Sequence, residues 1–309
     1  MQRISIDDFT VNGWTTPHEA AARSRHYCEL LEEGNILFFP HPPFEFSEAD
    51  RAFLLNVKQS DASYHKNIAY RPKQDKVTGF DRDAADSARL LTVMRNYSQR
   101  VIGFATQFLQ PYSDTWNLDY ASFRPVQEQG RQISMNARND LIHVDAFPTR
   151  PTNGDRILRI FTNINPTESR LWVTTDPFDV VAPPMAARAG LPRIAQRARN
   201  HRRPPSFVRA VVRRLGYRQI DRSPYDQFML DLHSTMKSDR QFQENCPKYR
   251  WEFAPGSTWM CFLDMVPHAA LKGQYAVEQT FFVARQSLLR PDKAPINVLE
   301  KLCGVALSH

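Results

Sequence analysis

Glycine, paired cysteine and long apolar runs are all scarce in this chain of 309 residues. Its 11 glycines stand beside 22 prolines, which excludes a flexible glycine-rich linker and favours stiff loops. The four cysteines lie far apart with no C-x-x-C pair, so we expect neither a zinc site nor a disulfide framework. No run approaches ~18 consecutive apolar residues, which argues against a membrane-spanning helix. The first residues contain no apolar segment typical of a secretory signal, and we therefore expect a cytoplasmic protein.

The composition that is present is apolar, aromatic and basic. Hydrophobic residues make up 42% of the chain and aromatic residues 11%, which indicates a folded globular protein rather than a disordered one. The length suits one large domain or two small ones, with a core that needs no disulfides. The formal net charge of +7 favours an anionic partner: a phosphorylated ligand, an anionic lipid or a nucleic acid.

The order of segments predicts a single domain with a β core. Residues 1–130 carry mostly helical patterns, including a long helix expected from about 84 to 109. Over residues 131–290 the chain changes to short segments rich in β-branched and aromatic residues, which are typical of a barrel or sandwich. A helical pattern at about 183–248 interrupts them and is interpreted as an insertion, and 291–309 form a last helix. We therefore expect an α+β, mainly β fold: a double-stranded β-helix, or cupin-like jelly roll, flanked by N-terminal helices.

The segment LIHVDAF places His143 and Asp145 two positions apart in a strand-like run. Side chains at i and i+2 of a strand point to the same face, so a metal ion would satisfy both polar groups if that face is buried. His268, at the end of the apolar segment STWMCFLDMVPH, is the expected third ligand. Two histidines and one carboxylate form the facial triad of non-haem Fe(II) oxygenases, which react with O2. His233, in helix-like surroundings, is the competing third ligand.

An oxygenase with this triad is expected to use 2-oxoglutarate, whose distal carboxylate needs a cation. The position of Arg285 after His268 is similar to that of the carboxylate-binding arginine in several families of this superfamily. A guanidinium group matches a carboxylate with two parallel hydrogen bonds. Arg156 and Arg159 are the alternatives; they lie on opposite faces of their expected strand, so only one of them could point into the barrel.

Two blocks, HVDAFPTRPTNGDRILRIFTNINP and PHAALKGQYAVEQTFFV, resemble the Kdo hydroxylases of Gram-negative bacteria, and the resemblance extends over essentially the whole chain. It implies an Fe(II)- and 2-oxoglutarate-dependent dioxygenase that hydroxylates 3-deoxy-D-manno-oct-2-ulosonic acid (Kdo) at C3, forming Ko in the lipopolysaccharide inner core. It also implies that His143, Asp145 and His268 bind iron while Arg285 holds the C5 carboxylate of 2-oxoglutarate. The implied acceptor is Kdo-lipid A or another lipopolysaccharide precursor at the cytoplasmic face of the inner membrane.

The insertion contains a strongly basic stretch. Residues 188–222 hold eleven arginines, no lysine and one acid, Asp221. Apolar residues at helical spacing between Phe207 and Leu215, with arginines beside them, predict a basic amphipathic helix suited to peripheral contact with an anionic membrane. The alternative is a solvated helix packed on the barrel by its apolar stripe. No aromatic residues alternate with the arginines to stack bases, so we expect no nucleic-acid partner.

Two other functions remain alternatives on the sequence. One is an Fe(II)/2-oxoglutarate oxygenase that acts on a different anionic substrate. The other is a non-catalytic, cupin-like protein that binds lipid surfaces. Release of succinate in response to substrate separates an enzyme from a binding protein, and the identity of that substrate separates the two oxygenases.

Overall fold

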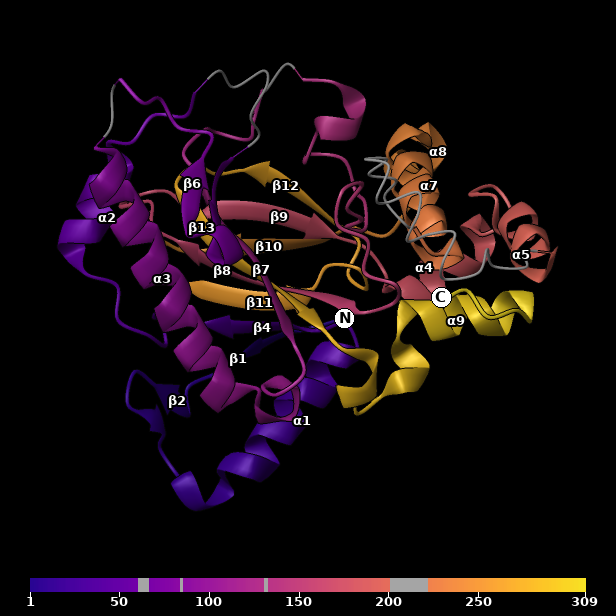
Figure 1. Ribbon diagram of the computed structural model, residues 1–309, viewed down its shortest axis with the longest axis horizontal. Helices are drawn as coiled ribbons and strands as arrows, with labels where there is room; N and C mark the ends of the chain where they lie inside the picture. The colour runs from indigo at the N-terminus through magenta and orange to yellow at the C-terminus, as the bar shows by residue number, and fades with distance from the viewer. Residues whose placement is uncertain (61–66, 84–85, 131–132, 201–221) are drawn as a thin grey trace, which may run out of the picture.

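Two facing β-sheets form the centre of the molecule in the computed structural model, which describes residues 1–60, 67–83, 86–130, 133–200 and 222–309 (Figure 1). The large sheet has eight strands in the order β1-β4-β11-β8-β13-β7-β5-β6, and the small sheet has three in the order β10-β9-β12. Neighbours in the large sheet are antiparallel, except that β1 runs parallel to β4. The small sheet is antiparallel throughout.

The strands of the large sheet are β1 (Arg3–Ser5), β4 (Ile36–Phe39), β5 (Ile68–Arg71), β6 (Lys76–Thr78), β7 (Asn117–Arg124), β8 (Arg156–Asn163), β11 (Thr258–Phe262) and β13 (Ala276–Val283). Those of the small sheet are β9 (Arg170–Thr174), β10 (Tyr249–Phe253) and β12 (His268–Lys272). A separate hairpin joins β2 (Phe9–Thr10) to β3 (Gly13–Trp14).

Alternation along the central strands divides the side chains between two cores. In β11, Trp259 and Cys261 face the small sheet, whereas Met260 and Phe262 belong to the core under the helices. Between the sheets the Trp259 ring stacks on Phe253 with the ring centres 4.0 Å apart. Because successive strand residues point to opposite faces, this register decides for every strand which side chains can reach the space between the sheets.

Helices α1 (Ala20–Glu32), α2 (Glu48–Leu55) and α3 (Ser87–Phe108) come from the first third of the chain, and α3 crosses the outer face of the large sheet (Figure 1). The contact between α3 and the sheet is mainly apolar: the ring of Phe104 meets that of Phe39 at 5.4 Å. One buried polar bond accompanies it, since the Ser98 hydroxyl donates to Gln279 Oε1 of β13 over 2.7 Å. These helices close the side of the sheet that faces away from the small sheet.

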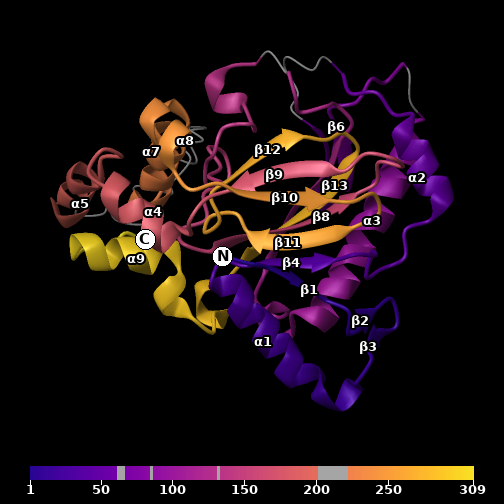
Figure 2. The same cartoon turned by 180° about the vertical axis from the view of Figure 1, so that it is seen from behind.

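The remaining helices gather at one end of the sandwich, as both ribbon views show (Figures 1 and 2). They are α4 (Phe178–Met185), α5 (Leu191–Asn200), α7 (Pro224–Ser238), α8 (Arg240–Asn245) and α9 (Pro295–Cys303). A capping box between Ser223 and Asp226 fixes the start of α7. The amphipathic helix expected between Phe207 and Leu215 lies outside the described residues. Within the described ranges, no helix is both long and apolar enough to cross a membrane.

The expected double-stranded β-helix is confirmed, with two differences in how the chain builds it. The first 130 residues also supply five strands of the large sheet: β1, β4, β5, β6 and β7. Four of these have three or four residues each, too few for a periodic pattern, and their pairing with distant strands stabilises them. The helical insertion begins at Phe178 rather than near 183, because Pro183 and Pro184 lie inside α4 instead of ending a segment.

Candidate active site

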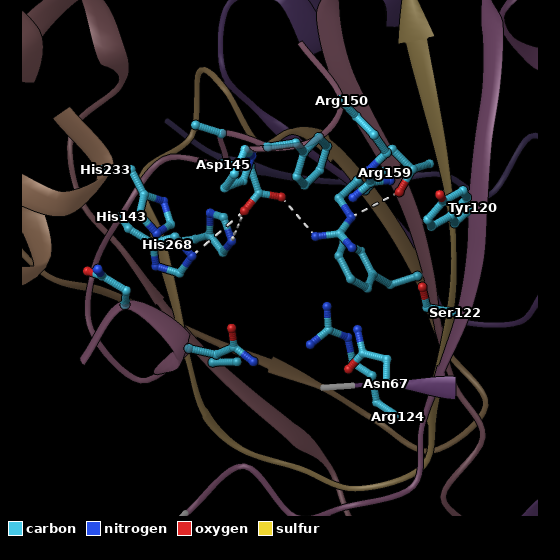
Figure 3. A pocket seen from close by; sticks show the side chains of 18 of the residues that line it. Asn67, Tyr120, Ser122, Arg124, His143, Asp145, Arg150, Arg159, His233 and His268 are labelled. Atoms are coloured by element: carbon cyan, nitrogen blue, oxygen red, sulfur yellow. Dashed lines mark hydrogen bonds and ion pairs between the residues drawn. The ribbon is translucent and has the colours of Figure 1, made fainter. Parts of the chain in front are cut away.

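His143, Asp145 and His268 meet in the space between the two sheets (Figure 3). His143 and His268 form a backbone bridge in which each N–H donates to the other residue's carbonyl, over 3.0 and 2.9 Å. The Nε2 atoms of His143 and His268 lie 3.7 and 4.0 Å from Asp145 Oδ1. All three side chains are buried, and their possible donor atoms lie within 4.8 Å of one another. The arrangement could hold a metal ion.

Both imidazoles are oriented from behind by the backbone. The Nδ1 of His143 lies 2.7 Å from the Leu141 carbonyl, and that of His268 lies 2.9 Å from the Val266 carbonyl. A carbonyl oxygen can only accept, so Nδ1 carries the proton and the lone pair of each Nε2 faces Asp145. Burial lowers the pKa of His268 and lowers that of His143 well below its ordinary value. Both rings are therefore neutral and ready to bind a metal.

The segment carrying His143 and Asp145 is held on both of its edges. On one edge its partners are the His268 backbone and the Leu263 carbonyl, which accepts from Asp145 N–H over 2.8 Å. On the other edge, side chains of α7 and α8 take the place of a strand. The Gln243 amide accepts from Ile142 N–H over 3.0 Å and donates to the Ile142 carbonyl over 2.8 Å. His233 Nδ1 donates to the Val144 carbonyl over 2.7 Å.

His233 is therefore placed beside the triad rather than within it. Its ring meets that of His143 edge-on at 4.8 Å, and it lines the same cavity. Among the described residues, His143, Asp145 and His268 form the cluster that could hold a metal ion, and His233 is not part of it. The preference for His268 over His233 agrees with this geometry.

A cavity of about 460 Å³ opens in front of the triad. Its wall is rich in arginine, with Arg124 from β7, Arg159 from β8 and Arg170 from β9, together with Arg150 from the loop before β8. Amides and hydroxyls complete it, and α7 contributes Leu230, His233 and Ser234. Figure 3 shows Arg159 between the histidines and the side chains of Tyr120 and Arg150. The site is thus a polar, cationic chamber with the triad on one wall.

Arg159 connects the triad to buried carboxylates of the sheet. Its Nη1 donates to Asp145 Oδ2 over 2.8 Å, and its Nη2 is bound to Glu278. Arg124 donates to both oxygens of Glu278, over 3.0 and 3.1 Å, and also reaches Glu128. Burial opposes ionisation of Glu278, but the guanidinium groups of Arg124 and Arg159 outweigh it and hold its pKa below the usual range. The carboxylate is therefore charged and keeps both arginines in place.

Arg285 does not reach this cavity. Strand β13 ends at Val283, and Arg285 begins a short 3-10 helix in which its Nη2 donates to Asn297 of α9 over 3.1 Å. By strand alternation Arg285 would share a face with Val277 and Phe281, which lie in the core under the helices. A longer strand would therefore also direct it away from the triad. The preference for Arg285 as a ligand of 2-oxoglutarate is corrected accordingly.

Arg156 and Arg159 lie on opposite faces of β8, as expected. Arg156 is fully buried on the far face, where its Nε donates to Asp264 over 2.7 Å. Arg159 is the one that lines the cavity. Three further cavity residues, Arg124, Arg150 and Trp172, escaped sequence reasoning. Two of them had a signal in the sequence. Arg150 lies within the FPTRPTNGDRILR block that resembles the family, and Arg124 ends β7, where strand alternation places it on the same face as Tyr120 and Ser122.

The comparisons with known proteins agree with this geometry. A sequence model described as 3-deoxy-D-manno-oct-2-ulosonic acid (Kdo) hydroxylase matches residues 14–306. The apo structure of the Kdo hydroxylase KdoO, a non-haem Fe(II) α-ketoglutarate-dependent dioxygenase, is 31% identical with a TM-score of 0.82, covering 100% of this chain and 98% of its own. The structure of KdoO with α-ketoglutarate and Fe(III) gives 31% identity, a TM-score of 0.81 and the same coverage. No curated protein matches the chain by sequence.

The fold and the His-Asp-His site define a non-haem Fe(II) dioxygenase that uses 2-oxoglutarate, the α-ketoglutarate of those descriptions, together with O2. The family match extends over nearly the whole chain, and the structural likeness over all of it. The chain belongs to the Kdo hydroxylase family. The class and the family expected from the sequence are both confirmed.

Gln243→Glu is expected to lower metal affinity, because it loosens the outer edge of the segment that carries His143 and Asp145. Losing a group that orients metal ligands typically costs roughly 10- to 100-fold. In the wild type, Gln243 Nε2 donates to the Ile142 and Met236 carbonyls over 2.8 Å each. The variant keeps the shape of the side chain but places a carboxylate oxygen against these two carbonyl oxygens. Titration with Co(II) and thermal unfolding measure the effect. Gln227→Glu on α7, a residue whose amide meets Asp231, is the matched control. Equal Co(II) affinity in the two variants would contradict the role given to Gln243.

Proposed function

We propose that this enzyme hydroxylates Kdo at C3 while the sugar is attached to lipid A or its precursor, at the cytoplasmic face of the inner membrane. Family membership supports Kdo as the sugar, and the resemblance implies the C3 position and the lipid carrier. The observation that carries the proposal is one cavity in which a His-Asp-His triad faces a wall of arginines. Such a chamber suits an anionic cosubstrate and an anionic acceptor together.

In this function His143, Asp145 and His268 are the Fe(II) ligands. The donor set of two neutral imidazoles and one carboxylate fits this metal and leaves one side of it open. Asp145 supports the fit because its two oxygens have different tasks: Oδ1 faces the histidines while Oδ2 accepts from Arg159. When bound, the iron supplies the oxidative chemistry that consumes O2 and 2-oxoglutarate. The chain's own task is to hold the three ligands and to orient the acceptor beside them.

Arg159 and Arg124, in place of Arg285, would bind the distal carboxylate of 2-oxoglutarate. Both guanidinium groups line the cavity and are fixed by Glu278. Trp172 adds support, because its ring is stacked on His268 and its buried Nε1–H has no hydrogen-bond partner among the described residues. A buried donor without a partner costs free energy, and an oxygen of the bound cosubstrate would satisfy it.

Incubation of the enzyme with Kdo-lipid A, Fe(II) and 2-oxoglutarate tests the function directly. We expect mass spectrometry to find one added oxygen on Kdo and an equal amount of succinate. NMR of the released sugar locates the new hydroxyl, and placement at any carbon except C3 would refute the position. Succinate release without hydroxylated Kdo would favour the oxygenase that acts on another anionic substrate.

His143→Ala, Asp145→Ala and His268→Ala should each abolish hydroxylation and Fe(II) binding, because each removes one of the proposed ligands. Circular dichroism and Co(II) titration separate loss of the metal from loss of the fold. His18→Ala, at a histidine whose side chain is 77% exposed, is the control and should keep full activity. Intact Fe(II) binding in His268→Ala, with loss in His233→Ala, would show that the third ligand is misassigned.

Arg124→Gln should weaken 2-oxoglutarate binding by about 1.5–3 kcal/mol, the usual value of a hydrogen bond to a charged group. The affinity for Co(II) should stay nearly unchanged, since Arg124 donates to Glu278 and Glu128 and not to the triad. Calorimetry of the Co(II)-loaded protein measures both affinities. Arg285→Gln makes the same chemical change outside the cavity and should bind 2-oxoglutarate normally. The reverse pattern would restore Arg285 as the cosubstrate ligand.

The basic stretch at 188–222 supports contact with an anionic, lipid-linked acceptor. Four of its arginines in the described part of the chain already have partners in the protein. Arg188 is paired with Asp239, Arg193 lies 3.8 Å from Asp231, Arg199 donates to the Cys303 carbonyl over 2.9 Å, and Arg222 donates to the Pro148 carbonyl over 2.7 Å. Pro148 lines the cavity, so the end of the stretch is attached to the active site. The arginines around residue 210 remain the candidates for the membrane.

Replacing Arg209, Arg213 and Arg214 with Gln should weaken sedimentation with anionic liposomes and raise the KM for Kdo-lipid A. Each basic residue at such a surface contributes about 1 kcal/mol, and less as salt rises. Replacing Arg25, Arg100 and Arg240 instead removes the same charge from exposed ion pairs elsewhere and is the control. Unchanged liposome binding and KM in the first variant would favour the alternative of a solvated helix packed on the barrel.

A further inference from the structure

Arg150 is a cavity arginine to which neither the triad nor the proposed cosubstrate site assigns a task. Its guanidinium carbon lies 4.1 Å from the centre of the Phe147 ring and 4.5 Å from that of Tyr120. Its Nη1 is paired with Asp119, whose side chain is 5% exposed. The Arg150 side chain itself is 26% exposed and lines the chamber in front of the triad. Two aromatic rings and a buried carboxylate therefore hold a cation in one orientation, facing the cavity.

The hydrogen bonding of Arg150 differs from that of Arg159 and Arg124. Arg159 is bound to Asp145 and Glu278, and Arg124 to Glu278 and Glu128, so each already meets two carboxylates of the protein. Within the described residues, Asp119 is the hydrogen-bond partner of Arg150. An arginine presents its N–H donors in a planar fork, so Arg150 keeps donors for a ligand that enters the cavity.

Phe147 lies beside both this cation and the arginine of the cosubstrate site. The Arg159 guanidinium carbon lies 6.0 Å from the Phe147 ring centre, and that of Arg150 lies 4.1 Å from the same centre. In the view of Figure 3, Arg150 and Tyr120 lie beyond Arg159 from the histidines. Two guanidinium groups therefore lie around the Phe147 ring. Because 2-oxoglutarate has one distal carboxylate, one of these groups is left for another anion.

The acceptor supplies a second carboxylate. Kdo is a sugar acid, as its family description states, and its carboxylate is attached to C2, the neighbour of C3. A carboxylate that enters a chamber with buried walls must find a cation and hydrogen-bond donors in exchange for water. We propose that Arg150 binds the carboxylate of the acceptor's Kdo and thereby selects sugar acids over neutral sugars. This inference rests on the proposed function.

The fixed orientation of Arg150 favours specificity. An unrestrained arginine would lose side-chain freedom on binding, whereas Asp119 and the two rings already restrict this one. Asp119 is held in turn, because Gln279 Nε2 of β13 donates to its backbone carbonyl over 3.0 Å. Arg150 would thus turn C3 of the sugar ring toward the metal side of the chamber by fixing the adjacent carboxylate.

The test compares Kdo-lipid A with the same acceptor after methyl esterification of the Kdo carboxylate, in the wild type and in Arg150→Gln. For the wild type, we expect the ester to lower kcat/KM roughly 10-fold or more, the equivalent of one charged hydrogen bond. For Arg150→Gln, kcat/KM for the acid should fall by a similar factor, and the difference between acid and ester should disappear. Hydroxylated Kdo is measured by mass spectrometry.

Arg150→Gln leaves Asp119 buried without its cation, so the double variant Arg150→Gln, Asp119→Asn removes both charges and guards against loss of the fold. It too should treat acid and ester alike, and calorimetry should find 2-oxoglutarate still bound to its Co(II) form. Arg95→Gln, which breaks an Arg–Asp pair outside the cavity, is the matched control and should keep the wild-type preference for the acid.

Two results would overturn the inference while leaving the proposed function intact. One is an ester penalty as large in the Arg150 variants as in the wild type. The other is a loss of 2-oxoglutarate affinity in place of the acid preference, which would place Arg150 in the cosubstrate site. If the wild-type enzyme forms no hydroxylated Kdo at all, the proposed function fails first and the inference with it.

Discussion

The carboxylate of Asp145 is the interaction on which the whole site depends. One oxygen faces the two histidines, at 3.7 and 4.0 Å from their Nε2 atoms, and the other accepts from Arg159 over 2.8 Å. A single side chain thus joins the candidate metal centre to the arginines of the large sheet. Because Asp145 is buried, neither half of this arrangement is stable alone: the carboxylate needs cations, and the cations need further carboxylates.

The sheet supplies those carboxylates through its register. Glu278 of β13 lies opposite Ser122 of β7 and Phe161 of β8, so it is flanked by the two strands that carry Arg124 and Arg159. A shift of one residue in β13 would turn Glu278 toward the helices and leave both arginines without their shared partner. The same register sends Gln279 to the opposite face, where it bonds Ser98 of α3. The bond between α3 and Gln279 therefore supports the same register of β13 that places Glu278 beside Arg124 and Arg159.

The triad was predictable from the sequence, whereas most of the cavity wall was not. His143 and Asp145 share a face by strand alternation alone, and His268 ends an apolar segment, so residue types and local pattern were enough. The choice of Arg285 rested on its position after His268, which does not show the face of the sheet. That face of β13 packs under the helices, and the strand ends at Val283 before a 3-10 helix. The role of Gln243 has no local signature, since its amide meets a backbone about a hundred residues away that only the tertiary structure brings close.

The helical insertion links the candidate metal centre to one wall of the chamber. Helix α7 lines the cavity through Leu230, His233 and Ser234, and His233 also holds the Val144 carbonyl between the two triad residues. The backbone of Val144 therefore cannot move without moving a side chain of the cavity wall. A ligand that displaced α7 would change the spacing of His143 and Asp145 through the bond from His233 to the Val144 carbonyl. The shape of the cavity wall and the spacing of the triad are therefore coupled in this fold, because the triad segment has a helix pair, and not a further strand, along its outer edge.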